Sequence, residues 1–358
     1  MATSMAPAAT VPSKFPASNI SSIKTFAESN GDAPIPSTFY SITEPPDDVA
    51  RDLAASIPVI DLSLLNSDDP QLHFKAVQQL GKACQEWGFF MITNHGISEN
   101  LMEDVMNKSN EYHNLPLEER KEFANKGYLE PIVHGTSFFP QAETANYWRD
   151  YLRVITHPQF NFPHKPQGYK ELAFEYSRKI RGVARILLQA ISESLGLEAD
   201  AIIESTDFDS GLQIFFVNLY PPCPQPDLSL GIPPHSDHGL LTLLTQNGVG
   251  GLQVKHHGKW VEVDPLPKCI LVNTGDQLEV VSNGRYKSVL HRAVLNNRDT
   301  RISVVLVNGP ALDKDISPAQ GLLEKEKPLF ESRTYNDYVQ DMRKSKFADK
   351  SALSEIRL

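Results

Sequence analysis

The apolar pattern of the chain changes from a helical to a β period at about Gly211, and this change limits the possible folds more than any other feature. After it come short apolar runs separated by Gly, Asn, Asp and Pro. Many short strands at regular spacing predict a closed barrel or a double-sheet jelly roll. The runs are LQIFFVNLY, GLLTLLTQ, GLQVKHHGKWVEV, KCILVNTGDQLEVVS, YKSVLHRAV and RISVVLVNGP.

Helical patterns dominate the region before these strands, and the longest covers residues 168–197. The aromatic stretch 128–165 is expected to be irregular, and the Pro-rich start of the chain reads as a segment laid over the surface. We therefore expect four regions along the chain. They are a partly flexible N-terminal arm (1–55), a mostly helical region (56–205), a jelly-roll core (206–312) and a helical C-terminal tail or lid (313–358).

The charge and cysteine content exclude several classes of function. A net charge of −10 disfavours nucleic acid and anionic membranes as partners, and no apolar run has the length of a membrane span. The three cysteines, Cys84, Cys223 and Cys269, are too widely spaced for a disulfide framework, which favours a reducing compartment and a cytoplasmic location. The first thirty residues could form a transit peptide, but a floppy extension is the better reading.

The stretch PPHSDHGLLTLL, residues 233–244, carries the strongest chemical signal. Side chains two apart on a strand share a face, so His235 and Asp237 are expected to meet one ion while His238 points elsewhere. His291, in YKSVLHRAV, lies on a later strand of the same β region. Two histidines and one carboxylate suit non-haem Fe(II) that activates O₂. The alternative is a histidine capped by its neighbouring carboxylate at a turn.

A second pair of polar residues favours the iron site over a simple turn. Arg301 and Ser303 share one face of the strand RISVVLV, ten residues after His291. A guanidinium fork with a hydroxyl beside a metal suits a dicarboxylate co-substrate. Asn218 and Tyr220, in NLYPPCPQP, end an earlier strand where they could reach the same co-substrate, although a rigid turn also explains that motif.

Taken in order, these motifs resemble the plant 2-oxoglutarate/Fe(II)-dependent dioxygenases, and IPVIDLS, EWGFFMITNHG and LPLEERKEF are similar to the N-terminal region of that family. The resemblance implies a double-stranded β-helix, or distorted jelly roll, wrapped by helices. It also implies iron at His235, Asp237 and His291, with 2-oxoglutarate held by Arg301 and Ser303 and contacted by Tyr220 and Asn218. Ascorbate is the expected reductant. The specialised-metabolism branch, with its flavonoid hydroxylases and O-demethylases, is the most similar.

The resemblance implies oxidation of a C–H bond in a small, largely apolar metabolite such as a flavonoid, alkaloid or terpenoid, by a chain that acts as a monomer. The outcome could be hydroxylation, O-demethylation or desaturation. An ascorbate-dependent oxidase of the same fold and a non-catalytic jelly-roll binding protein stay open. Core packing explains each aromatic candidate for the substrate pocket equally well. Arg149 and Arg153 are weaker candidates for substrate binding, because surface residues are the better interpretation of both. The aromatic candidates are Phe138, Phe139, Trp148, Phe215, Phe330 and Tyr335.

Overall fold

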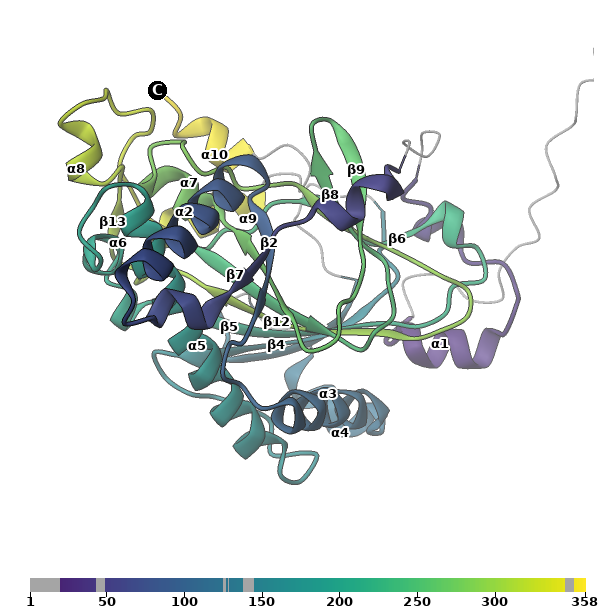
Figure 1. Ribbon diagram of the computed structural model, residues 1–358. Coiled ribbons are helices and arrows are strands. Elements are labelled where there is room, and N and C mark those ends of the chain that lie inside the picture. The colour runs from purple at the N-terminus through teal and green to yellow at the C-terminus, as the bar shows by residue number, and fades with distance from the viewer. Residues whose placement is uncertain (1–19, 43–48, 125–126, 128, 138–144, 345–350) are drawn as a thin grey trace, which may run out of the picture.

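The protein is described by a computed structural model in which two β-sheets form the centre of the molecule (Figure 1). The structure describes residues 20–42, 49–124, 127, 129–137, 145–344 and 351–358. The larger sheet has eight strands, and all but one of their pairings are antiparallel. Its order is β1 (Val59–Asp61), β2 (Phe89–Thr93), β10 (Ile270–Thr274), β7 (Leu241–Gln246), β12 (Arg301–Asn308), β5 (Gln213–Tyr220), β4 (Asp150–His157) and β3 (Ile132–Thr136).

A smaller sheet of four strands faces the larger one and completes the jelly roll that the strand spacing predicts. Its order is β6 (Leu230–His235), β11 (His291–Val294), β8 (Leu252–His256) and β9 (Lys259–Val263). Short antiparallel strands β13 (Asp315–Ile316) and β14 (Arg333–Thr334) form a separate pair near the C-terminus. The space between the two main sheets is therefore enclosed by residues from distant parts of the chain.

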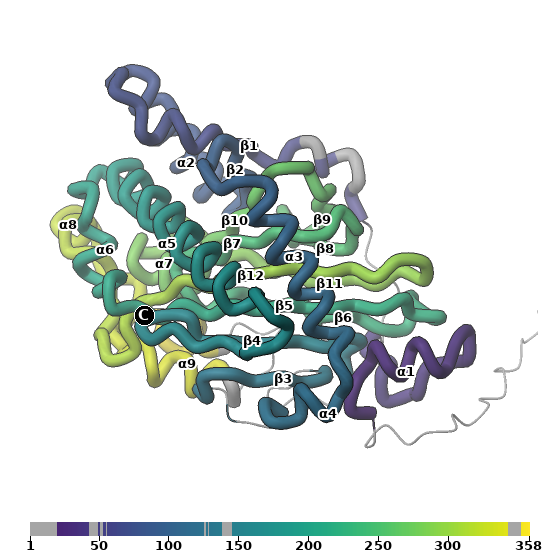
Figure 2. Tube along the Cα trace, turned by 90° about the horizontal axis from the view of Figure 1, so that it is seen from below, coloured from purple at the N-terminus to yellow at the C-terminus, as the bar shows by residue number. Residues whose placement is uncertain are grey.

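Helices cover the outer face of the larger sheet. Figure 2 shows α3 and α5 lying across its strands, and α2 packs against α5. Local signals set two helix starts: Asp69 caps α2 by accepting from the N–H groups of Gln71 and Leu72, and Ser98 caps α3. The helices are α1 (Ile23–Asn30), α2 (Pro70–Glu86), α3 (Glu99–Asn114), α4 (Leu117–Arg120), α5 (Tyr169–Ser194), α6 (Ala201–Ser205), α7 (Asp276–Val281), α8 (Gln320–Leu323), α9 (Tyr335–Lys344) and α10 (Ser351–Glu355).

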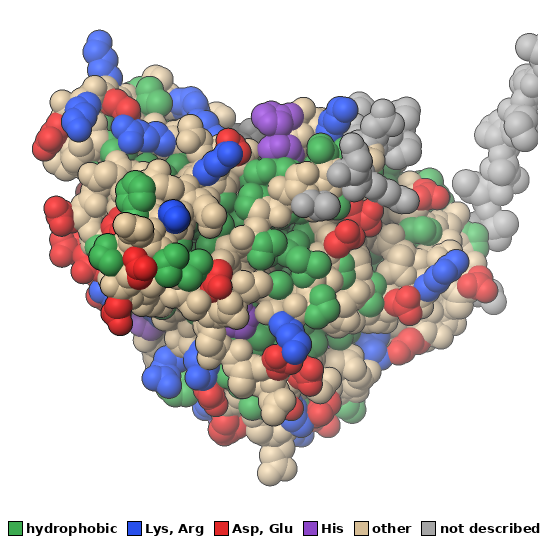
Figure 3. Space-filling view, in the orientation of Figure 1, with side chains coloured by type: hydrophobic (Ala, Val, Ile, Leu, Met, Phe, Trp, Pro, Cys, Tyr) green, Lys and Arg blue, Asp and Glu red, His purple; other side chains and the backbone are tan. Residues whose placement is uncertain are grey.

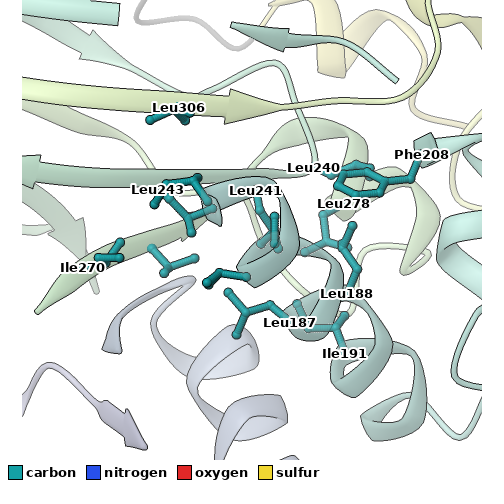
Figure 4. Packing of buried hydrophobic residues seen from close by; sticks show 14 of the residues in the cluster. Leu187, Leu188, Ile191, Phe208, Leu240, Leu241, Leu243, Ile270, Leu278 and Leu306 are labelled. Atoms are coloured by element: carbon teal, nitrogen blue, oxygen red, sulfur yellow. The ribbon is translucent and has the colours of Figure 1, made fainter. Parts of the chain in front are cut away.

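The main hydrophobic core lies between α5 and the larger sheet. Apolar residues at helical spacing along α5, among them Leu187 and Ile191, pack with Leu241 and Leu243 of β7 and Leu278 of α7 (Figure 4). These side chains are at most 1% exposed, so they contribute most of the stabilising apolar burial on this side. This packing fixes the position of β7, whose other face points toward the space between the sheets.

The N-terminal arm packs against the rest of the protein through α1. Asp150 accepts hydrogen bonds from the hydroxyl of Ser22 (2.7 Å) and the backbone N–H groups of Ile23 (2.8 Å) and Lys24 (3.1 Å). A carboxylate at this position satisfies free N–H groups of the first helical turn and complements the helix dipole. Phe26 of α1 then packs edge-on against Trp148, at 5.8 Å between ring centroids.

The prediction of irregular structure over residues 128–165 is wrong for two segments. β3 and β4 form an antiparallel pair there and extend the larger sheet beside β5. Buried polar side chains on β4, including Asp150 and Arg153, break the apolar alternation that marks a strand in sequence. Polar side chains stand at these positions of β4 because they form hydrogen bonds with the N-terminal arm and with a neighbouring loop.

The described surface carries charges of both signs. Figure 3 shows acidic and basic side chains interspersed over the face in view. Within the described residues, no helix combines the length and apolar character needed to cross a bilayer.

Candidate active site

Two histidines and an aspartate converge between the sheets. His235, at the end of β6, is the direct partner of His291 on β11 in the antiparallel register, so the two rings lie on the same face with centroids 4.2 Å apart. Asp237 follows β6 by two residues, and its Oδ1 is 3.7 Å from Nε2 of each histidine. One donor atom from each residue lies within 4.8 Å of the others, which is the spacing of three ligands around one metal ion.

Hydrogen bonds orient these three side chains toward a common point. Nδ1–H of His235 donates to the carbonyl of Pro233 (2.9 Å), and Nδ1–H of His291 donates to the carbonyl of Val289 (3.2 Å). This leaves the lone pair of each Nε2 free for a metal. Asp237 accepts from Asn273 through Oδ2 (2.8 Å), which leaves Oδ1 toward the histidines. Such second contacts are typical of built metal sites, and this donor set fits Fe(II).

The electrostatics keep two of the donors, His235 and Asp237, in their metal-binding protonation states. Burial, aided by the nearby His291, lowers the pKa of His235 to about 3. Burial alone would raise the pKa of Asp237, but His291 and His235 hold it at about 2. A neutral imidazole and an ionised carboxylate are the forms that bind a divalent cation.

A buried carboxylate behind the site connects the segments that carry the donors. Asp276 of α7 accepts hydrogen bonds from Ser236 (3.2 Å), Ser288 and, on α9, Tyr338 (2.8 Å). Ser236 lies between His235 and Asp237, whereas Ser288 precedes His291 by three residues. Asp276 therefore fixes both donor segments relative to each other and to the C-terminal helix.

The four residues predicted for the co-substrate lie together beside the triad. In the register of β5 and β12, Arg301 pairs with Tyr220 and Ser303 pairs with Asn218. The Arg301 guanidinium donates to Gln246 (Nη2 to Oε1, 2.8 Å) and lies over the Tyr220 ring at 5.1 Å. Its Nε is buried without a hydrogen-bond partner, and burial lowers the pKa of Arg301. A carboxylate bound here would satisfy that donor.

The metal and co-substrate residues line one cavity of about 960 Å³, a volume that includes its open mouth. The cavity lies between the two sheets, and α9 closes part of its wall through Met342. The lining residues besides the seven predicted ones are Phe89, Arg149, Phe216, Ile232, Ser236, His238, Thr242, Leu244, Leu252, Asn273, Arg292, Ala293, Val305, Val307 and Met342.

Two of the aromatic candidates for the substrate pocket pack into other parts of the protein instead. Phe215 points to the opposite face of β5, where its ring meets Phe162 at 5.3 Å in the main core. Trp148 receives the arm helix, and its Nε1–H donates to the carbonyl of Pro221 (3.1 Å). Both side chains are fully buried, and neither lines the cavity that holds the metal donors.

The two candidates from the C-terminal tail are also absent from the lining. Phe330 is 2% exposed and packs under the guanidinium of Arg357. Tyr335 is fully buried and shares a 2.6 Å hydrogen bond with Nδ1 of His238. This contact also explains why His238 is directed away from the three donors. The remaining candidates, Phe138 and Phe139, lie outside the described residues.

Sequence reasoning missed most of the cavity wall outside the metal and co-substrate residues, and three of the missed residues show why. Phe216 could have been found, because strand alternation places it on the face of Asn218 and Tyr220. Arg149, expected at the surface, is 7% exposed and lines the cavity. Met342 reaches the cavity only because α9 folds back across the core, and its local sequence carries no signal for this.

A jelly roll that holds two histidines and a carboxylate at the mouth of an apolar cavity defines a mononuclear non-haem iron oxygenase. Comparison with known protein families supports this class. The 2OG-Fe(II) oxygenase superfamily matches residues 211–310, and the family described as non-haem dioxygenase in morphine synthesis N-terminal matches residues 57–174.

The most similar relatives extend over most of the chain. 2-Oxoglutarate-dependent dioxygenase 19 of Oryza sativa subsp. japonica is 43% identical over 304 residues, which are 84% of this chain and 90% of the relative. Flavanone 3-dioxygenase 2 of the same organism is 39% identical over 290 residues, 79% and 82% of the two chains. The structure of JOX2 in complex with 2OG, Fe and JA superposes with a TM-score of 0.85 at 28% identity, covering 95% of this chain and 98% of that chain.

The chain therefore belongs to the 2OG-Fe(II) oxygenase superfamily and is a 2-oxoglutarate-dependent dioxygenase. Its cofactor is Fe(II), and its co-substrates are 2-oxoglutarate and O₂.

Proposed function

We propose that this dioxygenase oxidises a C–H bond of a small, largely apolar plant specialised metabolite, such as a flavonoid, alkaloid or terpenoid. The apolar side chains between the two sheets support this substrate class, since Phe216, Ile232 and Leu244 face the same cavity as the iron donors. The similarity to a flavanone 3-dioxygenase supports it as well. Hydroxylation, O-demethylation and desaturation all begin with oxidation of such a C–H bond.

The roles of the site residues follow from their positions. His235, Asp237 and His291 hold Fe(II), and the buried fork of Arg301 with the hydroxyl of Ser303 binds the distal carboxylate of 2-oxoglutarate. Tyr220 and Asn218 contact the same co-substrate from β5. The single observation that carries the proposal is that all seven residues, from β5, β11, β12 and the C-terminal end of β6, line one cavity.

Fe(II) held at this site would activate O₂, with one oxygen atom oxidising 2-oxoglutarate to succinate and CO₂ and the other oxidising the C–H bond of the substrate. The chain orients these groups and excludes water. Asn273 holds the Asp237 carboxylate in place, and the Pro233 carbonyl fixes the His235 ring. The apolar wall from β12, with Val305 and Val307, keeps the oxidation away from solvent.

Succinate release tests the proposal directly. Purified protein with Fe(II), ascorbate as reductant and 2-oxoglutarate is incubated with panels of flavonoids, alkaloids and terpenoids. We expect succinate above the uncoupled background with members of one panel, together with a product that is oxidised or has lost a methyl group. An Asp237→Ala control should give none. If no compound raised succinate above background, the proposed substrate class would be wrong.

We also propose that the enzyme acts as a monomer in a reducing compartment such as the cytoplasm. Cys84, Cys223 and Cys269 are all free thiols, which suits a reducing compartment. Light scattering of the eluted protein at assay concentration tests the first point, since a stable dimer mass would contradict it.

A further inference from the structure

Arg149 resembles Arg301 in having a buried guanidinium with few hydrogen bonds, but it lies outside the set of residues predicted for the co-substrate. Its side chain is 7% exposed, and the one hydrogen bond it makes with described residues runs from Nη1 to Oδ1 of Asn218 (2.9 Å). Its Nε is buried and has no hydrogen-bond partner among the described residues. Its guanidinium carbon also lies 5.2 Å from the centroid of the Tyr151 ring, and no described carboxylate forms an ion pair with it. A guanidinium therefore reaches the cavity with most of its donors unused.

The carboxylate next to Arg149 in sequence does not neutralise it. Asp150 is fully buried and accepts from Ser22 and from the backbone of the arm helix. It also accepts from the hydroxyl of Thr136 (2.7 Å). Strand alternation directs Asp150 toward the arm and Arg149 toward the cavity, so the two charges serve different faces of β4.

The charge balance of the loaded site leaves Arg149 unmatched. Fe(II) carries two positive charges, which Asp237 and one carboxylate of 2-oxoglutarate offset. The other carboxylate of 2-oxoglutarate offsets Arg301. The third guanidinium in the lining, Arg292, is already engaged, since it donates to Gln253 (2.8 Å) and lies over the Trp260 ring at 4.1 Å. A buried charge without a counter-ion is unfavourable, and a bound anion would relieve that cost.

We propose that Arg149 binds a carboxylate of the substrate, so that the enzyme acts on a small, mostly apolar carboxylic acid. This inference rests on the proposed function and narrows it. The unused N–H groups of Arg149 suit a charge-assisted carboxylate pair. The apolar wall from Phe216 and Val305 receives the rest of the molecule. An acid held at Arg149 lies in the same cavity as the iron donors, which presents its carbon skeleton for oxidation.

The test compares acids with their own primary amides, which keep the shape and lose the charge. The probes are 4-coumarate, phenylacetate and cyclohexylacetate, each with its amide, titrated by calorimetry into protein loaded with Mn(II) and 2-oxoglutarate so that no turnover occurs. We expect at least one acid to bind about ten-fold or more tightly than its amide. Arg149→Gln should remove that preference, whereas Arg149→Lys should retain part of it because the charge remains.

Arg292→Gln is the matched control, because it removes a guanidinium from the same cavity that already has partners. It should leave the ratio of acid to amide affinity unchanged. Amides that bind as tightly as every acid in the unmodified protein would overturn the proposal. So would an Arg149→Gln variant that keeps the acid preference but loses affinity for 2-oxoglutarate, since Arg149 would then act only by positioning Asn218. Circular dichroism of each variant establishes that the loss is not unfolding.

Succinate release separates a failure of this inference from a failure of the proposed function. The same acids and amides, with a neutral flavonoid panel, are incubated with the Fe(II) enzyme. Succinate formed with neutral compounds but with no acid would contradict the role of Arg149 and leave the proposed function standing. Succinate formed with no compound at all would contradict both.

Discussion

Asp237 and His238 are adjacent in sequence, yet their side chains have separate partners. Asp237 faces two histidines, whereas Nδ1 of His238 bonds the phenol of Tyr335 on the C-terminal helix. The residue that completes a metal site is therefore distinguished by strand direction and not by residue type. A histidine beside a metal ligand need not bind the metal itself.

Substitution of these neighbours should have different effects on metal content. Asp237→Ala removes an anionic donor, so we expect iron bound after reconstitution to fall well below one equivalent, with loss of succinate formation. His238→Ala should keep close to one equivalent, because His235, Asp237 and His291 retain their geometry. Elemental analysis after gel filtration measures both, and equal iron loss in the two variants would contradict this assignment.

The Arg301 fork should tolerate lysine poorly. Lysine keeps the charge but presents a point donor where the guanidinium presents two aligned N–H groups. We expect Arg301→Lys to raise KM for 2-oxoglutarate by about ten-fold or more, with a smaller change in kcat. Steady-state kinetics with varied 2-oxoglutarate checks this. An unchanged KM would mean that Arg301 does not contact the co-substrate.

Sequence reasoning placed Arg301 and Ser303 together because they are two residues apart on one strand, β12. Asp237 lies two residues beyond the end of β6, so its position beside His235 comes from the turn that follows the strand and not from strand alternation. The substrate wall could not be predicted in the same way. Trp148 carries no local mark that separates a ring packed against the arm helix from a ring facing a ligand.

At the scale of elements, β5 illustrates how one strand serves the core and the cavity at once. Phe215 packs with Phe162 and Tyr176 in the main core, and Phe216 lines the cavity. The two phenylalanines are adjacent and chemically identical, so they form a matched pair for separating stability from function.

Phe215→Ala and Phe216→Ala should therefore give opposite results. Removal of the core ring should lower the free energy of unfolding by about 3–5 kcal/mol. Phe216→Ala should cost less stability but change KM for the substrate by several-fold, because the ring borders the cavity. Urea unfolding measures the loss of stability in each variant, and steady-state kinetics measures the change in KM. A larger loss of stability at Phe216 would reverse the assignment of the two faces.

A glycine fixes the turn between β6 and β7 against α7. A Cβ on Gly275 would meet the carbonyl oxygen of Gly239 at 2.2 Å, and the N–H of Asp276 donates to the carbonyl of Asp237 (2.8 Å). The backbone around Asp237 is thus held by direct contact with the start of α7. The sequence predicts a β run over KCILVNTGDQLEVVS, but β10 ends at Thr274 and α7 begins at Asp276, so the second half of that prediction is wrong. The close approach of the two backbones is visible only in the structure.

At the scale of the whole molecule, two buried histidines make stability depend on pH. Burial lowers the pKa of His113 well below its usual value, and its ring nitrogens have no partner among the described residues. Burial, with the nearby charge of Arg120, lowers the pKa of His134 to about 4. Both histidines are therefore neutral in the folded protein at pH values where the unfolded chain takes up protons near 6.5.

The stability of the fold therefore falls as pH drops below 6.5, and the loss of stability from His134 continues to about pH 4. Each histidine contributes up to about 1.4 kcal/mol per pH unit in this interval. We expect His134→Gln to reduce the slope of unfolding free energy between about pH 6.5 and pH 4.5. His164→Gln, at an exposed position, is the control and should keep the slope of the unmodified protein. Identical slopes in all three proteins would contradict the assignment.

The pairing of His235 with His291 across β6 and β11 also sets the order of events during synthesis. The two strands are separated by the whole β7–β10 segment, so two of the three donors meet only after that segment has folded around them. Closing such a long loop is slow compared with local structure. A chain that ends before β11 lacks His291 and therefore has no complete set of iron donors. We expect tight iron binding only in chains in which β6 and β11 have paired.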